Sequence, residues 1–408
     1  MRRILSAILA ILVFSLSWIQ AAEIDFSKLS FAQNPDHVVL FVIDGLSYKV
    51  WSKLHLPILT KMIESGSLVE KTYLPPPAHP RVKAYAELHS CSIPNPIMMA
   101  GTIFIGPHTV YLPQMFFPKK TTAFVANSTA YITLTKFYNY CYLQNSDDSS
   151  SIEWALKFMK EGKPDFIRVH LQQPGEAGSE SLMTEEKVSW KYNIWAKDAP
   201  YRKAIERADG LLGEFIRGLQ EIGILERTAL IVLGDHGQSD TGWHPAEILD
   251  SAITTTVFWG AGIKKGVKIP YSEMIDIVPT ICLLMKLQTS PGVLGRPIVE
   301  ACSEYKGMIP PRTMHIAELN QVFLEYQNKL LEFYNLIGKV PAGRQQYLFT
   351  QLRWEVLEKF YDINRFSEWP EFNSVKELLD NNRQVLDKLK GIIYDLKKYD
   401  ETPQSFTD

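Results

Sequence analysis

The sequence predicts an α/β fold in which helices flank a mostly parallel sheet, followed by a helical C-terminal region. Three largely apolar, β-branched segments support this prediction, each followed at once by polar or turn residues: 38–43, 166–171 and 230–233. Near-continuous apolar runs indicate parallel strands that are covered on both faces. From about residue 309 this strand pattern stops and long amphipathic stretches begin.

Helices are predicted between these strands. Residues 201–222 carry apolar side chains at the spacing of one helix face, which makes a strand, helix, strand crossover with the strands on either side. Residues 56–63 predict another helix, which a glycine ends. In open parallel sheets the ligand lies outside the carboxyl ends of the strands. Asp44, Asp235 and His236 stand at those ends.

The chain is expected to divide into a catalytic domain over residues 23–308 and a helical region over residues 309–408. Three amphipathic stretches define the second part, and their apolar stripes are typical of packing faces: 316–336, 343–361 and 375–398.

Residues 1–22 have the order of a secretory signal peptide: two arginines, an apolar run and a small-residue end. The alternative is an uncleaved anchor, but the apolar run over residues 4–19 is shorter than the ~20 residues that a spanning helix needs. We therefore expect a secreted or periplasmic protein without an integral membrane segment in the mature chain.

The net charge bears on the binding partner, and the cysteine content bears on disulfide formation. The net charge of -2 provides no basic field, so nucleic acid is not expected as an obligate partner. The four cysteines, Cys91, Cys141, Cys282 and Cys302, permit up to two disulfides in an exported chain. Free buried thiols are the alternative, since a cysteine also serves as a small apolar residue.

The polar residues after the strands suit a metal ion. Asp44 alone is weak evidence, because Asp-Gly is a common turn. Asp235 and His236 place a carboxylate beside an imidazole after a second strand, and His244 follows eight residues after His236. Carboxylates and imidazoles together favour zinc, with manganese or iron as alternatives.

Five segments follow one another along the chain: 42–46 (VIDGL), 234–237 (GDHG), 242–244 (GWH), 259–263 (WGAGI) and 276–280 (DIVPT). These segments and their order resemble the alkaline phosphatase superfamily, in particular its type I phosphodiesterase and nucleotide pyrophosphatase branch. The resemblance implies an alkaline phosphatase-like fold for the catalytic domain and hydrolysis of a small-molecule phosphate ester.

The resemblance also implies a nucleophile. Residues 92–95 read SIPN, so Ser92 would bind the metal and attack the ester, and Asn95 would donate a hydrogen bond to a phosphoryl oxygen. A serine hydroxyl is a poor nucleophile until a metal stabilises its anion. Asp44, Asp235 and His236 would hold that metal. The alternative for Ser92 is a helix cap or turn serine.

By the same resemblance, a second metal site would lack two of its expected ligands. In the segment 174–179 (PGEAGS), Gly175 stands where an aspartate is expected and Ser179 where a histidine is expected. Glu176 is the candidate substitute, which would bind a second ion together with His244. The alternatives are a site with one ion, in which His244 only supports the ligands, and a degenerate site without turnover.

Three other functions compete with phosphate ester hydrolysis. A sulfatase would need an arginine four residues after the nucleophile, where this chain has Pro96. A transferase of phosphoryl-linked groups usually carries a membrane-spanning bundle, which the sequence lacks. A binding protein would retain metal without turnover. We expect His79, His89 and His170 to be structural residues held by hydrogen bonds.

Overall fold

A computed structural model describes most of the chain: residues 24–74, 80–90, 97–99, 102–105, 110–245, 248–290, 295–304, 311–362, 365, 368, 371–372 and 375–401. The predicted signal peptide, residues 1–22, lies outside the described residues, as do Ser92 and Asn95. Within the described residues, no helix is both long and apolar enough to cross a lipid bilayer.

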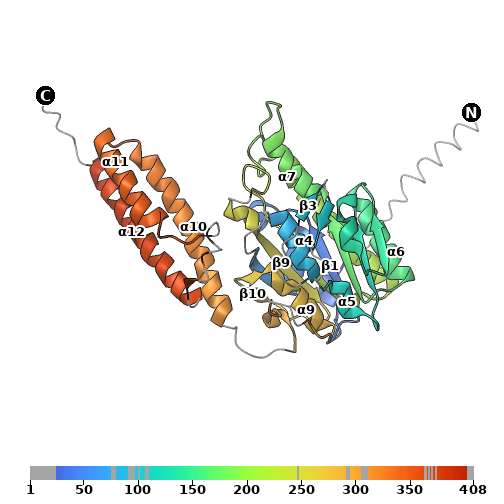
Figure 1. Ribbon diagram of the computed structural model, residues 1–408. Coiled ribbons are helices and arrows are strands. Elements are labelled where there is room, and N and C mark those ends of the chain that lie inside the picture. The colour runs from blue at the N-terminus through green and yellow to red at the C-terminus, as the bar shows by residue number, and fades with distance from the viewer. Residues whose placement is uncertain are drawn as a thin grey trace, which may run out of the picture.

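A central sheet carries the fold, as the sequence predicts (Figure 1). Among the described residues the sheet has nine strands, in the order β10-β2-β9-β8-β1-β7-β5-β6, with β11 beside β2. Their bounds are β1 His37–Ile43, β2 Ser67–Tyr73, β5 Thr122–Ala126, β6 Tyr140–Leu143, β7 Phe166–Leu171, β8 Thr228–Leu233, β9 Ile253–Gly260, β10 Val267–Ile269 and β11 Ser272–Glu273. A separate hairpin consists of β3 Ile97–Met99 and β4 Thr102–Phe104.

The middle of the sheet is parallel. Strand β1 lies between β7 and β8 and runs parallel to both. Strands β5 and β6 continue the parallel order beyond β7. Only β9, of the strands described in this sheet, runs against its neighbours β8 and β2. The three strands predicted from the sequence are β1, β7 and β8, and all three are buried along almost their whole length.

Two apolar clusters cover the two faces of the sheet. On β1, Val38, Leu40 and Val42 belong to one cluster, whereas Val39 and Phe41 belong to the other. The first face is covered by α4 Pro80–Ser90, α5 Leu112–Phe116 and α9 Ile277–Leu284. The second is covered by α3 Pro57–Glu64, α6 Asp148–Glu161 and α8 Pro200–Ile222. Helix α7 Gln173–Met183 follows β7 directly.

The C-terminal part is helical and lies beside the sheet in Figure 1. It comprises α10 Pro311–Ile337, α11 Ala342–Gln351, a π-helical continuation Leu352–Leu357 (η7), and α12 Val375–Glu401. Three ion pairs join α10 to α12: Glu318–Arg383, Glu325–Lys390 and Glu332–Lys397. Both partners advance by seven residues from one pair to the next, so α10 and α12 run parallel and face each other in constant register.

The described cysteines are free thiols. Cys141 is exposed, whereas Cys282 and Cys302 are buried. Cys91 lies outside the described residues. No disulfide therefore joins Cys141, Cys282 and Cys302, and the alternative of free thiols holds for all three.

Candidate metal centre

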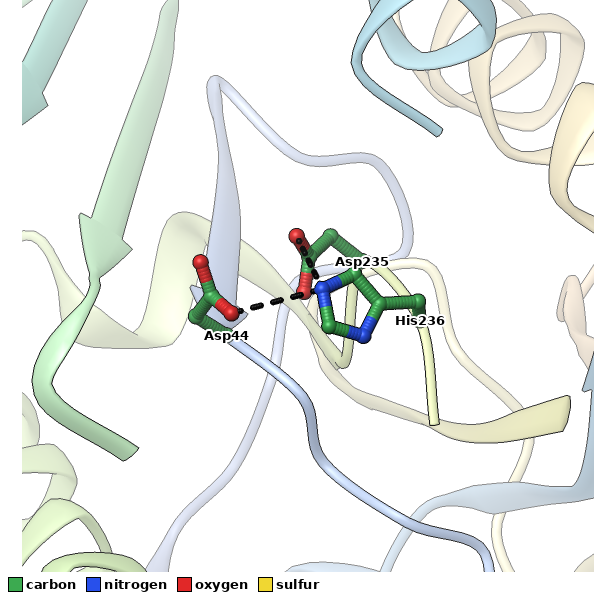
Figure 2. Close-up of side chains that lie close together, drawn as sticks. All are labelled: Asp44, Asp235 and His236. Atoms are coloured by element: carbon green, nitrogen blue, oxygen red, sulfur yellow. Dashed lines mark ion pairs between the residues drawn. The ribbon is translucent and has the colours of Figure 1, made fainter. Parts of the chain in front are cut away.

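Two neighbouring strands bring three predicted ligands together. Asp44 directly follows β1, and Asp235 and His236 follow β8 after one glycine. Because β1 and β8 are parallel neighbours, their carboxyl ends meet at one edge of the sheet. The three side chains converge there (Figure 2) and are fully buried.

The three side chains present one ligand atom each to a common point. His236 Nε2 lies 3.4 Å from Asp44 Oδ1 and 3.4 Å from Asp235 Oδ2. The three ligand atoms lie within 4.8 Å of one another, and no other such group occurs among the described residues. Ligands about 2.1 Å from a tetrahedral zinc ion are about 3.4 Å apart. These separations therefore fit one divalent ion.

Backbone contacts hold this arrangement. The amide of Gly45 donates to Asp235 Oδ1 at 2.9 Å, which leaves Oδ2 for the cluster. His236 Nδ1 lies 2.7 Å from the carbonyl oxygen of Gly237. Because a carbonyl only accepts, Nδ1 carries a proton, and Nε2 is the ring nitrogen that faces the carboxylates. A metal-binding histidine is commonly oriented in this way.

The unsatisfied atoms are the strongest sign of a ligand. Asp44 Oδ1, Asp235 Oδ2 and His236 Nε2 are buried and have no hydrogen-bond partner in the structure. Leaving one buried polar group unsatisfied costs about 1–3 kcal/mol, and more for a charged group. Three such atoms at one point fit a cation as their common partner. The donor set of two carboxylates and an imidazole suits zinc, manganese or iron.

The second oxygen of Asp44 has quite different surroundings. Asp44 Oδ2 accepts from Arg81 Nη2 at 2.5 Å and from Tyr85 Oη at 3.1 Å, and His170 Nε2 lies 3.4 Å away. Burial alone would raise the pKa of Asp44, but the Arg81 charge and the contacts with His170 and His236 hold that pKa well below its usual range. Asp44 is therefore a carboxylate with one oxygen saturated and the other unsatisfied.

A buried polar network extends from this oxygen into the domain. Tyr85 Oη lies 2.8 Å from Tyr131 Oη, which lies 3.2 Å from His170 Nε2. Arg168 Nη2 lies 3.1 Å from His170 Nδ1, and Arg168 Nη1 lies 2.6 Å from His89 Nε2. Burial and the Arg168 charge lower the pKa of His89, and burial also lowers the pKa of His170. Both histidines are thus hydrogen-bonded and buried, as the sequence predicts.

Arg81, Tyr85 and Arg168 contribute to the site although no sequence motif marks them. Arg81 and Tyr85 are four residues apart on α4, so they share one helix face. Arg168 lies in the middle of β7 and is fully buried. A charged residue inside an otherwise apolar strand is the signal that indicates such a network.

Two further predicted metal ligands, His244 and Glu176, are not among the three clustered side chains. His244 stacks on His236, with ring centroids 4.0 Å apart, but is not one of the three clustered ligands. Glu176 is exposed on α7, and its Oε1 accepts from Gln172 Nε2 at 2.8 Å. The structure thus brings His244 beside the cluster and leaves Glu176 at the surface.

Positions 175 and 179 hold no ligand. A Cβ atom at Gly175 would lie 1.8 Å from Asp44 Oδ1, so the backbone of α7 occupies the space beside that carboxylate. Ser179 Oγ donates to the carbonyl oxygen of Gly175 at 3.1 Å, within its own helix. Gly175 therefore lies against Asp44 without offering a ligand side chain, and the hydroxyl of Ser179 is engaged within its own helix.

The predicted nucleophile and its partner lie outside the described residues. Helix α4 ends at Ser90, two residues before Ser92, and the description resumes at Ile97, beyond Asn95. His79 also lies outside, directly before the start of α4 at Pro80. The roles assigned to Ser92 and Asn95 therefore remain predictions.

Comparison with known sequences gives one family and one curated relative. Residues 108–281 match the family type I phosphodiesterase / nucleotide pyrophosphatase. GPI ethanolamine phosphate transferase 3 of Schizosaccharomyces pombe is 29% identical over 132 residues, which are 30% of this chain. The match spans only 14% of the length of that relative.

Solved structures with the same fold add two further likenesses. The lipoteichoic acid synthase LtaP of Listeria monocytogenes has a TM-score of 0.50 at 15% identity, over 68% of this chain and 81% of that one. A 2-O GAG sulfatase has a TM-score of 0.51 at 12% identity, over 68% of this chain and 76% of that one. At these identities the likeness concerns the fold.

Proposed function

Because this chain has the fold of the alkaline phosphatase superfamily, in which phosphodiesterases and sulfatases share one architecture, we propose that it is a metal-dependent hydrolase of small phosphate esters. One observation carries the proposal. Three buried ligand atoms, on Asp44, Asp235 and His236, converge without any hydrogen-bond partner. Such an arrangement is costly unless it binds a cation.

The residues of the proposed centre have different roles. Asp44, Asp235 and His236 would hold the divalent ion, which we propose to be zinc, with manganese or iron as alternatives. When bound, such an ion supplies positive charge that favours the ionised form of a nearby hydroxyl and stabilises developing oxyanions. Ser92 is the proposed nucleophile, and Asn95 the proposed hydrogen-bond donor to a phosphoryl oxygen.

The proposed reaction has two displacements at phosphorus. The Ser92 oxygen forms a bond to phosphorus, the bond from phosphorus to the ester oxygen breaks, and the departing alcohol takes up a proton. Water then forms a bond to phosphorus, the bond to Ser92 breaks, and the serine hydroxyl regains its proton. A covalent phosphoserine connects the two steps.

Metal analysis combined with hydrolysis tests the proposal. The purified protein is analysed for transition metals and assayed with a bis-aryl phosphate, an aryl phosphate and an aryl sulfate. We expect bound metal, which Asp235→Asn removes, and phosphate ester cleavage, which Ser92→Ala abolishes while the fold persists. Cleavage of the aryl sulfate alone would replace the proposal with sulfate ester hydrolysis. Metal binding without turnover of any ester would favour a degenerate site or a binding protein.

Export and domain organisation form part of the same proposal. Residues 1–22 are proposed to be a cleaved signal peptide, which directs the protein to the periplasm or the cell exterior. Residues 23–308 would form the catalytic domain and residues 309–408 a helical region. The intact mass of protein recovered from the exported fraction tests the cleavage, since a mature chain that starts near residue 23 is expected.

A further inference from the structure

A fully buried arginine lies in the middle of the sheet. Arg168 belongs to β7, where it pairs with Leu40 of β1 on one side and with Phe124 of β5 on the other. Removing a guanidinium from water costs free energy unless its charge and its donors find partners. Its Cζ atom lies 5.1 Å from the ring centroid of Phe124 and 5.8 Å from that of Tyr85. Two aromatic rings therefore stabilise the charge.

The N–H groups of Arg168 contact two imidazoles. Nη2 lies 3.1 Å from Nδ1 of His170, and Nη1 lies 2.6 Å from Nε2 of His89. Because a guanidinium only donates, each of these two ring nitrogens must offer a lone pair. An imidazole that accepts at one nitrogen carries its proton on the other. His170 therefore carries its proton on Nε2, the nitrogen that lies 3.4 Å from Asp44 Oδ2.

The proton on His170 Nε2 begins a chain of donors that ends at Asp44. Tyr85 Oη donates to Asp44 Oδ2 at 3.1 Å. Because Tyr85 gives its only hydroxyl proton to Asp44, it must accept in its 2.8 Å contact with Tyr131. Tyr131 has then given its own proton, so its Oη accepts from His170 Nε2 at 3.2 Å. Every donor between Arg168 and Asp44 thus points the same way.

The opposite proton position on His170 would break this order. With a proton on Nδ1, two donors would face each other, because Arg168 Nη2 already points there. If that proton were the only one on the ring, the lone pair of Nε2 would face Asp44 Oδ2 and compete for the hydroxyl proton of Tyr131. Aligned hydrogen bonds, by contrast, polarise and strengthen one another. Arg168 therefore excludes the arrangement that would repel the carboxylate.

From these contacts we infer that Arg168 is a positioning residue, which keeps the proton of His170 on Nε2. The chain through Tyr131 and Tyr85 then presents a donor to Asp44 Oδ2, and Asp44 Oδ1 is held toward the other clustered ligand atoms. Loss of an outer partner that orients a metal ligand typically lowers metal affinity about 10–100-fold. The inference rests on the proposed function in one respect, because it takes Asp44 to be a metal ligand.

The proton position on His170 tests the inference directly. NMR spectra that correlate ring protons with ring nitrogens are recorded on the full-length protein with labelled histidines, and His170→Gln identifies the His170 signals. We expect a proton on Nε2 and none on Nδ1 in the wild type. In Arg168→Met, which removes the donors at similar side-chain length, a proton should appear on Nδ1. A wild type with a proton on Nδ1, or an unchanged pattern in folded Arg168→Met, would overturn the inference.

Zinc affinity measures the consequence for Asp44. Competition with a chelating dye should show that Arg168→Met binds zinc at least about tenfold more weakly than the wild type. Tyr131→Phe removes one hydroxyl from the middle of the chain and should also weaken zinc binding, but it should leave the His170 proton on Nε2. The double variant should bind zinc no more weakly than Arg168→Met, because both substitutions interrupt the same chain. Additive losses, or unchanged affinity in Arg168→Met, would contradict the inference.

A matched control separates the chain from general effects of a lost hydroxyl. Tyr142→Phe changes another buried tyrosine, whose Oη donates to Gln144, and should bind zinc as the wild type does. If Arg168→Met does not fold, the wild-type spectrum and the Tyr131→Phe variant decide the inference. Zinc affinity in Tyr131→Phe equal to that of Tyr142→Phe would then overturn it.

Failure of the proposed function has a different signature. If the wild type binds no zinc and hydrolyses no ester, the proposed function fails, and the proton position on His170 still decides the role of Arg168. If the wild type binds zinc and hydrolyses phosphate esters but His170 carries a proton on Nδ1, the proposed function stands and the inference falls.

Discussion

Asp44 combines two environments in one carboxylate. Its Oδ2 contacts a guanidinium, a tyrosine hydroxyl and an imidazole, whereas its Oδ1 has no hydrogen-bond partner. The saturated oxygen fixes the orientation of the carboxylate, because three donors converge on it. The unsatisfied oxygen is thereby held toward Asp235 and His236, ready for a cation.

Gly175 provides a test of this arrangement at a single atom. In Gly175→Ala the new Cβ would lie 1.8 Å from Asp44 Oδ1, so the carboxylate or α7 must move. We expect zinc affinity to fall at least about tenfold, which corresponds to about 1.4 kcal/mol. Competition with a chelating dye measures this affinity. Gly391→Ala on α12, where a Cβ meets nothing within 4 Å, is the matched control and should bind zinc normally.

The buried carboxyl of Asp148 leads us to predict that the free energy of unfolding depends on pH, independently of any catalytic role. Burial at the start of α6 raises the pKa of its carboxyl to about 7, against the lowering effect of the hydrogen bond from the Gln173 amide. The folded protein therefore holds this proton more tightly than the unfolded chain. The corresponding stability is present below about pH 4 and is lost as the pH rises to about 7.

Asp148→Asn isolates this contribution. Its free energy of unfolding should match that of the wild type near pH 4 and exceed it by up to roughly 4 kcal/mol at pH 8, the equivalent of the pKa change. Urea unfolding at several pH values measures the difference. Glu153→Gln, on the exposed side of α6, should show no such trend. A constant difference between wild type and Asp148→Asn would contradict the assignment.

Sequence patterns predict ligands that follow strands but not the side chains that support them. The sequence made it possible to predict Asp44, Asp235 and His236 as candidate ligands, because they closely follow apolar segments. Arg81 contacts a carboxylate 37 positions away in the chain, so no local pattern records the pair. The position of Gly175 beside Asp44 depends likewise on how α7 packs at the sheet edge, which no local spacing reveals.

At the scale of elements, the parallel pairing of α10 and α12 is held by a regular set of ion pairs. Arg383, Lys390 and Lys397 on α12 each meet a glutamate of α10. These side chains are between 26% and 52% exposed, so each pair contributes at most about 1 kcal/mol. Their seven-residue spacing nevertheless defines which turns of the two helices face each other.

Charge reversal tests this register. Glu325→Lys places a lysine against Lys390 and should lower the free energy of unfolding by about 0.5–1 kcal/mol. Lys390→Glu in the same chain restores opposite charges and should recover most of the loss. Denaturant unfolding at low salt measures both variants, and high salt should diminish the difference. Additive effects of the two substitutions would show that the residues are not paired.

Strand identity was predictable in the middle of the sheet, whereas strand direction was not. Strands β1, β7 and β8 are covered on both faces, so their sequences are apolar along most of their length. The antiparallel strand β9 is equally buried, although its sequence ITTTVFWG includes three consecutive threonines. Its direction follows from how its connections to β8 and β2 are routed, and composition does not specify that route.

For the whole molecule, the described residues are held together by apolar clusters rather than by covalent links between distant parts of the chain. The larger cluster includes residues of the sheet, such as Phe258, together with Leu319 and Leu389 of the C-terminal helices. Cys141, Cys282 and Cys302 take part in no disulfide. The sheet and the C-terminal helices are therefore connected through packed side chains.

Reducing agent should leave the melting temperature unchanged. Loss of a native disulfide typically costs about 2–5 kcal/mol, which a thermal melt resolves easily. Thiol labelling with and without denaturant complements the melt: Cys141 should react in the folded protein, whereas Cys282 and Cys302 should react only after unfolding. Cys141→Ser identifies the signal of the exposed thiol. A lower melting temperature under reduction would reveal a disulfide.

The close approach of Gly175 to Asp44 also has an evolutionary consequence. One base change converts a glycine codon into an aspartate codon, so an aspartate at this position is within easy mutational reach. Any side chain there, however, meets the Asp44 carboxylate at 1.8 Å and displaces one member of the cluster before it can add another. A chain with this packing therefore cannot accept an aspartate at position 175 in one step, because α7 must first move away from the sheet edge.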